Sequence, residues 1–212
     1  MRRCLQLARL GAGHVAPNPM VGAVLVFEDR VIGEGYHRRY GGPHAEPECI
    51  ASVAEPDKTL IGRSTLYVSL EPCAHHGKTP PCADLIVRMG ISRVVIGCRD
   101  PFPEVNGKGI ERLRAAGVEV QTGILEDECV RLNKRFFTFH LEDRPFIVLK
   151  WAQTARGFIA HSRAGAERLR ISNEITDRLV HKWRSEEASI LVGPRTAVLD
   201  DPALTVRLWK GP

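Results

Sequence analysis

The sequence predicts an α/β fold in which helices cover both faces of a central sheet. Runs rich in β-branched residues alternate along the chain with amphipathic helical patterns, and this alternation is typical of such a fold. The chain has 212 residues, 43% of them hydrophobic and 26% charged, which fits a soluble globular protein and excludes a collagen-like or largely disordered one. Its longest apolar stretches, such as residues 22–27, fall far short of the roughly 20 residues that span a bilayer, so we expect no transmembrane helix.

The N-terminal part of the chain begins with an expected helix over residues 1–13, which ends at Gly11 and Gly13. Residues 21–27 and 31–36 flank the polar Glu28-Asp-Arg30 and predict a β-hairpin. The pattern continues with expected helices at 45–54, 83–89 and 110–116, strands at 65–70, 93–97 and 118–122, and a charged helix at about 126–140.

A polar cluster, Glu142-Asp-Arg-Pro145, marks a predicted boundary between a domain at 1–143 and a second one at 144–212. In the second domain we expect strands at 146–151, 158–160 and 190–192, and a helix that is capped by Ser172 or Asn173 and runs to about Arg184. This pattern stops too soon to close a sheet, so we expect the second domain to be incomplete.

Charge and cysteine content narrow the chemistry. The net charge of +5 favours anionic partners, either phosphorylated small molecules or nucleic acid. The Arg-rich first ten residues fit a helix face better than a targeting signal, because Gln6 and Arg9 interrupt their apolar run. Without a signal peptide, the six cysteines favour a reducing cytoplasm and thiol or metal chemistry over disulfides. We expect four of them to pack in the core, with a ligand role left open for the second: Cys4, Cys49, Cys98 and Cys129.

The other two cysteines form a metal-binding pattern with a histidine. His44, Cys73 and Cys82 supply one imidazole and two thiolates, three ligands that leave the fourth position of a tetrahedral zinc for water, as in catalytic sites. Glu46, two residues after His44, can then move protons beside the metal without binding it. A His-x-Glu followed by Pro-Cys and a second Cys is the signature of zinc deaminases, in which ammonia leaves an amidine-type ring carbon.

The spacing of the two cysteines departs from the Cys-x-x-Cys of nucleic-acid and nucleoside deaminases. Here eight residues, Ala-His-His-Gly-Lys-Thr-Pro-Pro, separate them. This loop carries His75, His76 and Lys78, whose side chains can donate hydrogen bonds to a phosphate beside the metal. The alternative is an exposed polar loop without a ligand.

The most specific motifs of the chain are Asn18-Pro-Met-Val-Gly22, His44-Ala-Glu46, Glu71-Pro-Cys-Ala-His-His-Gly-Lys-Thr-Pro-Pro-Cys82, and Asp100-Pro101 followed by Gly107-Lys-Gly109. In these motifs the sequence resembles the deaminase domain of the bifunctional riboflavin-biosynthesis deaminase-reductase family. The resemblance to this family extends over essentially the whole chain. It implies a cytidine-deaminase-like, three-layer α-β-α domain. It also implies hydrolysis of the 2-amino group of 2,5-diamino-6-(5-phosphoribosylamino)pyrimidin-4(3H)-one to give the corresponding uracil. Pro47-Glu48-Cys49 departs from the apolar residues that are usual in the family at this point.

The resemblance also implies roles for single residues. The zinc ligands would be His44, Cys73 and Cys82, with Glu46 as the proton shuttle. Asn18 would bond the pyrimidine, and the ribose phosphate would be held by His37, His75, His76 and Lys78.

Beyond Pro145 the chain resembles the start of the same family's reductase domain, a dihydrofolate-reductase-like fold that uses NADPH to reduce the ribosyl group to ribityl. The matching stretches are Leu149-Lys-Trp-Ala152, Arg170-Ile-Ser172, Trp183-Arg184 and residues 196–207. The resemblance implies cofactor contacts from Ala152, Arg170, Thr196 and Asp200, and substrate contacts from Arg184, Leu204 and Arg207. Arg156-Gly157 replaces the family's Asp-Gly, and no Gly-x-Gly-x-x-Gly occurs, so we expect no reduction by this incomplete domain.

We therefore expect a cytoplasmic zinc deaminase of riboflavin biosynthesis that acts on a phosphorylated pyrimidine, without nucleic-acid or membrane partners, and with a homo-oligomer left open. One alternative is an RNA or nucleoside (cytidine or adenosine) deaminase of the same superfamily, for which Cys-x-x-Cys and more than 6% aromatic residues would be expected. The other is a zinc-stabilised binding module, which would need a closed, four-ligand site.

Overall fold

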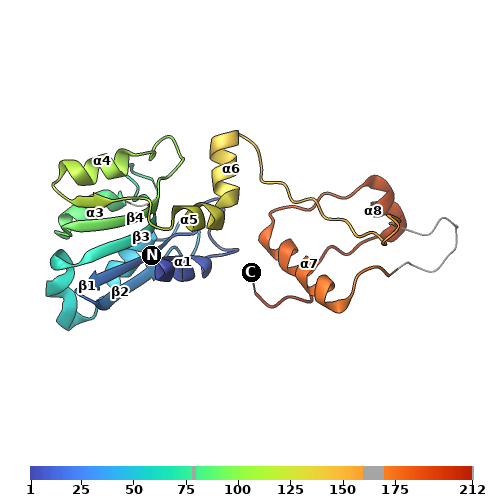
Figure 1. Ribbon diagram of the computed structural model, residues 1–212, viewed down its shortest axis with the longest axis horizontal. Helices are drawn as coiled ribbons and strands as arrows, with labels where there is room; N and C mark the ends of the chain where they lie inside the picture. Colours follow the sequence, from blue (N-terminus) through green and yellow to red (C-terminus); the bar gives the residue numbers. More distant parts are fainter. Residues whose placement is uncertain (78–79, 160–169, 212) are drawn as a thin grey trace. The chain divides into compact units, whose positions relative to one another are not determined.

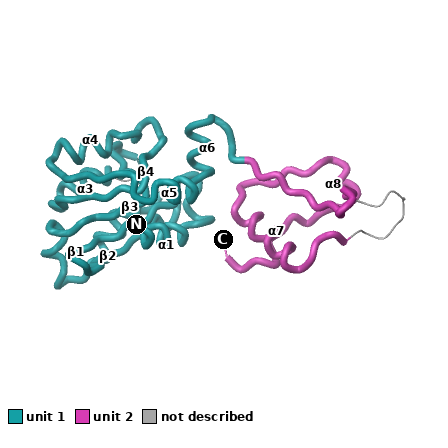
Figure 2. Tube along the Cα trace, viewed as in Figure 1, with its two compact units in different colours: residues 1–146 teal, residues 147–212 magenta. Residues whose placement is uncertain are grey.

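The computed structural model describes residues 1–77, 80–159 and 170–211 (Figure 1). The chain forms two compact units, Met1–Phe146 and Ile147–Pro212, which are coloured separately in Figure 2.

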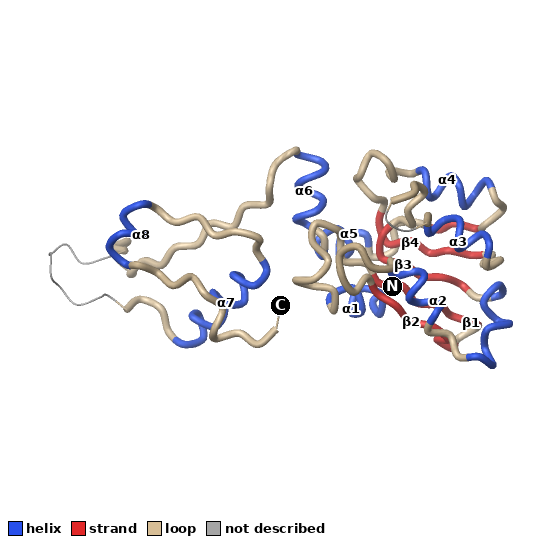
Figure 3. The backbone as a smooth tube through the Cα atoms, turned by 180° about the vertical axis from the view of Figure 1, so that it is seen from behind, coloured by secondary structure: helices blue, strands red, loops and turns tan. Residues whose placement is uncertain are grey.

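Unit 1 is built on a mixed sheet of five strands, drawn red in Figure 3. Along the chain the strands are β1 (Gly22–Phe27), β2 (Arg30–Tyr36), β3 (Thr65–Leu70), β4 (Arg93–Cys98) and β5 (Glu119–Gln121), and their order in the sheet is β2-β1-β3-β4-β5. The hairpin β1–β2 pairs Gly22 with Tyr36 and is antiparallel, as is the pairing of β1 with β3, whereas β4 and β5 continue in parallel. The structure thus confirms all five strands that the sequence predicts in this part of the chain, with shifts of at most one residue at each end.

Helices cover both faces of this sheet. They are α1 (Arg2–Arg9), α2 (Ala45–Ala51), the 3₁₀ helix η1 (Glu55–Arg63), α3 (Cys82–Arg88), α4 (Lys108–Ala115), α5 (Glu126–Leu132) and α6 (Lys134–Glu142). Ala23 and Leu25 of β1 belong to the main core with α2, α3 and α4, whereas Val24 between them packs with Cys4 and Leu7 of α1. Since side chains of a strand alternate between faces, α1 and α2–α4 lie on opposite sides of the sheet. This is the predicted three-layer arrangement.

The charged region predicted as a helix at 126–140 is helical, but it is divided into two helices, α5 and α6, which meet at Asn133. Asn133 is buried and its side-chain amide binds the backbone of Met20: the Oδ1 accepts from the Met20 N–H at 2.8 Å and the Nδ2 donates to the Met20 carbonyl at 2.9 Å. A distant segment therefore fixes the chain direction where the sequence pattern alone would continue one helix.

In the described part of unit 2 two helices form, α7 (Glu174–Glu186) and α8 (Pro194–Asp200). The start of α7 is as predicted, since the Asn173 Oδ1 accepts from the Thr176 N–H at 3.0 Å and the Thr176 Oγ1 accepts from the Asn173 N–H at 2.9 Å. The strands predicted at 146–151, 158–159 and 190–192 are wrong, because these residues pair with no neighbouring strand in the described structure; position 160 lies outside it. Each helix of the described residues is too short or too polar to span a lipid bilayer.

Candidate active site

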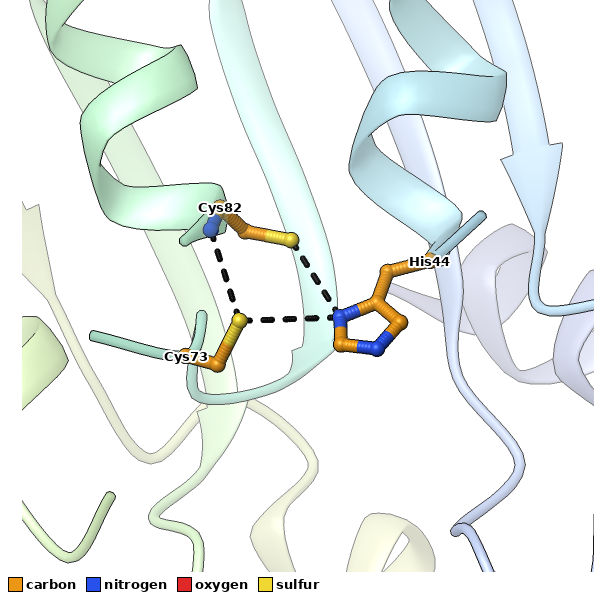
Figure 4. A group of neighbouring side chains, drawn as sticks. All are labelled: His44, Cys73 and Cys82. Carbon is orange, nitrogen blue, oxygen red and sulfur yellow. Dashed lines mark hydrogen bonds between the residues drawn. The ribbon is translucent and has the colours of Figure 1, made fainter. Parts of the chain in front are cut away.

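The candidate metal ligands stand at the ends of three elements of unit 1. His44 is the N-cap residue of α2, with φ −74° and ψ 174°, and Cys82 is the first residue of α3. Cys73 lies in the loop that follows β3. Because the residue before each ligand is a proline with a fixed φ, the chain reaches each of these turns with little freedom. Figure 4 shows the three side chains converging.

Their ligand atoms are close enough for one ion. The His44 Nδ1 lies 3.6 Å from the Cys73 Sγ and 3.4 Å from the Cys82 Sγ, and all three ligand atoms lie within 4.8 Å of one another. Tetrahedral zinc with Zn–S bonds of about 2.3 Å and Zn–N bonds of about 2.0 Å separates its ligand atoms by roughly 3.5–3.8 Å. Both the spacing and the soft donor set of two sulfurs and one imidazole therefore fit zinc.

The two cysteines shift each other's pKa in opposite directions. The hydrogen bond from Cys82, followed in weight by the bond with His44, lowers the pKa of Cys73 to about 4, despite its burial. The same interaction with Cys73 raises the pKa of Cys82, which keeps the proton. The Cys82 N–H also donates to the Cys73 Sγ at 3.3 Å. The lowered pKa of Cys73 favours its thiolate, the form of cysteine that binds a divalent cation.

Glu46 lies in the first turn of α2 and is buried, with 3% of its surface exposed. Burial raises its pKa, and the neighbouring His44 opposes that shift. Its carboxyl group is not among the atoms of the described residues that cluster as metal ligands. A buried carboxyl group with a raised pKa beside a metal site, but outside it, suits proton transfer.

Asn18 and His37, both predicted substrate contacts, lie together beside His44. The Asn18 Nδ2 is 3.1 Å from the His37 Nε2, the His37 Nδ1 is 2.8 Å from the Pro43 carbonyl, and the rings of His37 and His44 are 5.4 Å apart. Since a carbonyl only accepts, the His37 Nδ1 carries a proton and the Nε2 accepts from Asn18. Burial lowers the pKa of His37 below its ordinary value of 6.5, which favours the neutral ring. This arrangement favours His37 as a support for Asn18 over a cationic contact with phosphate.

The loop between the two cysteines lies beside the site. His75 is half-buried, and its ring packs edge-on to Phe102 at 5.8 Å, while His76 is exposed. Lys78 lies outside the described residues. Phe102 in turn packs on a cluster that contains Cys73 and Cys82. Of the three phosphate contacts predicted on this loop, the described structure thus places one, His75, at the wall of the metal site.

Sequence reasoning left two acidic residues of the motifs without a role. Asp100 is buried, which raises its pKa to about 7, and its Oδ1 accepts from the Phe102 N–H at 2.8 Å. Glu71 is buried at the end of β3 and accepts hydrogen bonds from four backbone N–H groups. Their place beside proline in two of the quoted motifs is the signal that singles them out, but a role needs the tertiary contacts.

The candidate residues of unit 2 lie on several segments. Arg184 donates to the Thr205 carbonyl at 3.2 Å, and the Arg207 guanidinium donates to the Thr205 Oγ1 at 2.8 Å, so the two predicted arginines meet at Thr205. Leu204 is half-buried next to them, with φ 50°. The cofactor candidates are more dispersed: Thr196 and Asp200 are exposed on α8, Ala152 is half-buried in the first segment of the unit, and Arg170 is exposed near the start of α7.

Two family models match the chain. Residues 1–98 match the zinc-binding region of cytidine and deoxycytidylate deaminases, and residues 145–212 match the RibD C-terminal domain. Among curated proteins, the chain is 46% identical over 207 residues to a riboflavin biosynthesis protein RibD of Aquifex aeolicus, covering 98% of this chain and 56% of the relative. It is 41% identical over 210 residues to the RibD protein of Escherichia coli, covering 99% of this chain and 55% of the relative. The chain therefore spans about half the length of the curated relatives it matches.

Solved structures of RibD proteins are also similar to this chain. A diaminohydroxyphosphoribosylaminopyrimidine deaminase/5-amino-6-(5-phosphoribosylamino)uracil reductase of Thermotoga maritima is 46% identical and superimposes with a TM-score of 0.89, covering 100% of this chain and 59% of that one. An Acinetobacter baumannii RibD structure is 37% identical with a TM-score of 0.88, covering 97% of this chain and 56% of that one. With a zinc-binding deaminase region followed by a RibD C-terminal region, the chain is similar to RibD proteins over about half of their length.

Proposed function

We propose that unit 1 is a zinc-dependent deaminase of riboflavin biosynthesis. Its substrate would be 2,5-diamino-6-(5-phosphoribosylamino)pyrimidin-4(3H)-one, and water would replace the 2-amino group to give the uracil and ammonia. The observation that carries this proposal is the convergence of His44, Cys73 and Cys82 beside the buried carboxyl group of Glu46. The domains proposed with it are residues 1–143 for deamination and 144–212 for the part of the reductase.

His44, Cys73 and Cys82 would hold the zinc, since the spacing of their ligand atoms fits its bond lengths. When bound, zinc would act as a Lewis acid that lowers the pKa of water from about 15.7 to about 7. A closed structural site is disfavoured, because the cluster in the described residues contains three ligands and Cys49 packs in the main core instead.

Glu46 would carry the protons of the reaction. One of its carboxylate oxygens would take a proton from the attacking water and deliver it to the departing nitrogen, so that the group ends the cycle as it began. The burial of Glu46 supports this role, because a carboxyl group away from bulk water can hold the proton between the two transfers.

Asn18 would orient the pyrimidine. Its Nδ2 is engaged with His37, which leaves the Oδ1 to accept a hydrogen bond from the ring or its amino groups. His75, His76 and Lys78 would bind the phosphate, and the net charge of +5 supports attraction of such an anion. The eight residues between Cys73 and Cys82 argue against a nucleic-acid deaminase, which would have Cys-x-x-Cys. The six free cysteines favour a location in the cytoplasm.

Unit 2 would belong to the NADPH-dependent reductase part, with Arg184 and Arg207 contacting the substrate and the guanidinium pair suited to its phosphate. Ala152, Arg170, Thr196 and Asp200, proposed for NADPH, lie on separate and largely exposed segments in the described structure. These residues by themselves do not account for a reductive step.

Ammonia release by the zinc-loaded protein tests the deaminase. We expect release from the diaminopyrimidinone phosphate, and none from cytidine or tRNA. Ammonia from cytidine or tRNA alone, or none from the phosphate substrate at full zinc occupancy, would refute the proposal.

The matched variant is Glu46→Gln, which keeps the shape of the side chain and removes its basicity. It should retain zinc and lose turnover. Loss of zinc in this variant would make Glu46 a ligand and would contradict its role as proton carrier.

A further inference from the structure

The carboxylate of Glu71 is a hub of backbone hydrogen bonds next to the candidate metal site. Its Oε2 accepts from the N–H groups of Asp100 at 3.2 Å and Gly107 at 3.0 Å. Its Oε1 accepts from the N–H groups of Gly109 at 3.0 Å and Ile110 at 3.2 Å. Glu71 is 4% exposed, so these bonds form away from water. The two carboxyl oxygens together carry about four lone pairs, so each of the four N–H donors meets an acceptor site.

These donors belong to the segment that joins β4 to α4, residues 99–107, here called the β4–α4 loop, and to the first turn of α4. The N–H groups at a helix start have no partner within the helix, so Glu71 supplies one for Gly109 and Ile110. The contact is also sterically tight, since a Cβ on Gly109 would lie 1.9 Å from the Pro72 carbonyl oxygen. The turn that carries Cys73 and the start of α4 are therefore held against each other.

The β4–α4 loop forms part of the wall of the metal site. Its residues Phe102 and Val105 pack in one cluster with Cys73 and Cys82, and Phe102 also contacts His75. Hydrogen bonds within the loop shape it, since the Phe102 carbonyl accepts from the N–H groups of Val105 at 2.8 Å and Asn106 at 2.9 Å. Glu71 supplies the bonds that tie this loop and the start of α4 to the end of β3.

We propose that Glu71 is a positioning residue, whose four hydrogen bonds seat the β4–α4 loop against the two cysteines and so set the geometry of the metal site. The inference rests on the proposed function, because it assigns Cys73 and Cys82 to a metal. Glu71 itself touches neither the metal ligands' donor atoms nor the substrate in this role; it acts through Phe102 and Val105.

The test is Glu71→Gln in the full chain. Glutamine has the same shape, but its amide nitrogen is a donor that would face two backbone N–H groups. We expect faster hydrogen–deuterium exchange across residues 99–110 and an altered visible absorption spectrum of the Co²⁺-substituted protein, whose bands report ligand geometry. Zinc content should stay near that of the wild type, and kcat should fall roughly 10- to 100-fold with a smaller change in KM.

The matched control is Glu111→Gln, which makes the same charge change in the first turn of the same helix, on an exposed side chain. It should leave the exchange, the cobalt spectrum and kcat as in the wild type. A second variant, Glu71→Asp, keeps the charge but shortens the reach, and it should lie between the wild type and Glu71→Gln on all three measurements. It also provides the comparison if Glu71→Gln does not fold.

Lower thermal stability of the Glu71 variants with an unchanged cobalt spectrum and unchanged kcat would overturn the proposal, since Glu71 would then only stabilise the fold. The same spectral change in Glu111→Gln would overturn it too, because charge alone would explain the effect. If the wild type releases no ammonia, the proposed function fails, but the exchange and the cobalt spectra still decide the role of Glu71.

Discussion

In unit 1, Leu25 and Leu66 are completely buried between the sheet and its helices, whereas in unit 2 Leu149 is 79% and Leu191 is 99% exposed. Both units contain short apolar runs of the kind that form strands. In unit 1 each run has a neighbouring strand that takes up its backbone hydrogen bonds and a helix that covers one of its faces. The comparison teaches that an apolar run becomes a strand only where partners for its backbone and its side chains are present.

The largest expected difference between the two units is in the stability that each loses when a leucine is shortened to alanine. Leu66→Ala should lower the free energy of unfolding of unit 1 by about 2–5 kcal/mol, because it leaves a cavity in a packed core. Leu191→Ala should change the stability of unit 2 by no more than about 0.5 kcal/mol. Urea unfolding can follow the units separately, since all three tryptophans lie in unit 2 (Trp151, Trp183 and Trp209) and exchange protection of β3 reports unit 1. A large loss of stability from Leu191→Ala would show that unit 2 buries this side chain.

Zinc binding and ammonia release should depend on unit 1 and not on unit 2. Cys82→Ala removes one of three proposed ligands and should weaken zinc binding by at least about 100-fold, as measured by competition with a chelator. Arg184→Ala in unit 2 should leave both zinc affinity and ammonia release unchanged. A deaminase rate that falls with Arg184→Ala would show that unit 2 contributes to the first site.

Two asparagines allow a matched comparison of hydrogen bonding. Asn133→Ala leaves two partly buried backbone groups of Met20 without their hydrogen-bond partner and should lower the free energy of unfolding of unit 1 by about 2 kcal/mol. Asn173→Ala removes an exposed helix cap and should cost unit 2 about 1 kcal/mol. Equal costs in the same unfolding experiments would mean that burial does not distinguish these bonds.

The last comparison is a pH dependence of stability that has opposite sign in the two units, with a slope of at most about 1.4 kcal/mol per pH unit for each group. Burial raises the pKa of Asp100 from 3.8 to about 7, so folded unit 1 holds a proton that the unfolded chain releases. Its contribution to stability is therefore lost as the pH rises from about 4 to 7.

In unit 2 the sign is reversed. Burial lowers the pKa of His181, whose Nδ1 accepts from the Arg207 N–H at 3.0 Å, so its contribution is lost as the pH falls below its ordinary value of 6.5. Unfolding of the metal-free protein across this range should show each slope flattened by its own variant, Asp100→Asn or His181→Gln. A slope in unit 1 that Asp100→Asn leaves unchanged would assign the pH dependence to another group.

Sequence patterns predict the sheet of unit 1 well because its strands alternate or run apolar between clear turn residues, as in the hairpin around Glu28. They also predict His44, Cys73 and Cys82 as metal ligands, because residue type and spacing alone indicate a zinc site. They do not predict the break at Asn133 or the hub at Glu71, since both depend on backbone groups that lie far away in sequence. They overpredict strands in unit 2, where the apolar runs at 146–151 and 190–192 find no neighbour in the described structure.

The placement of the three proposed ligands at the ends of separate elements bears on when the site can be loaded during synthesis. His44, Cys73 and Cys82 leave the ribosome early, but β3, which precedes Cys73, pairs with β4, and the turn after it is held by the start of α4. A nascent chain that has not yet exposed residues up to about Ile110 therefore has its ligands without the frame that brings them together. In a zinc finger the metal organises a short peptide. In this domain, by contrast, we expect the metal ion to bind only after the chain up to α4 has folded.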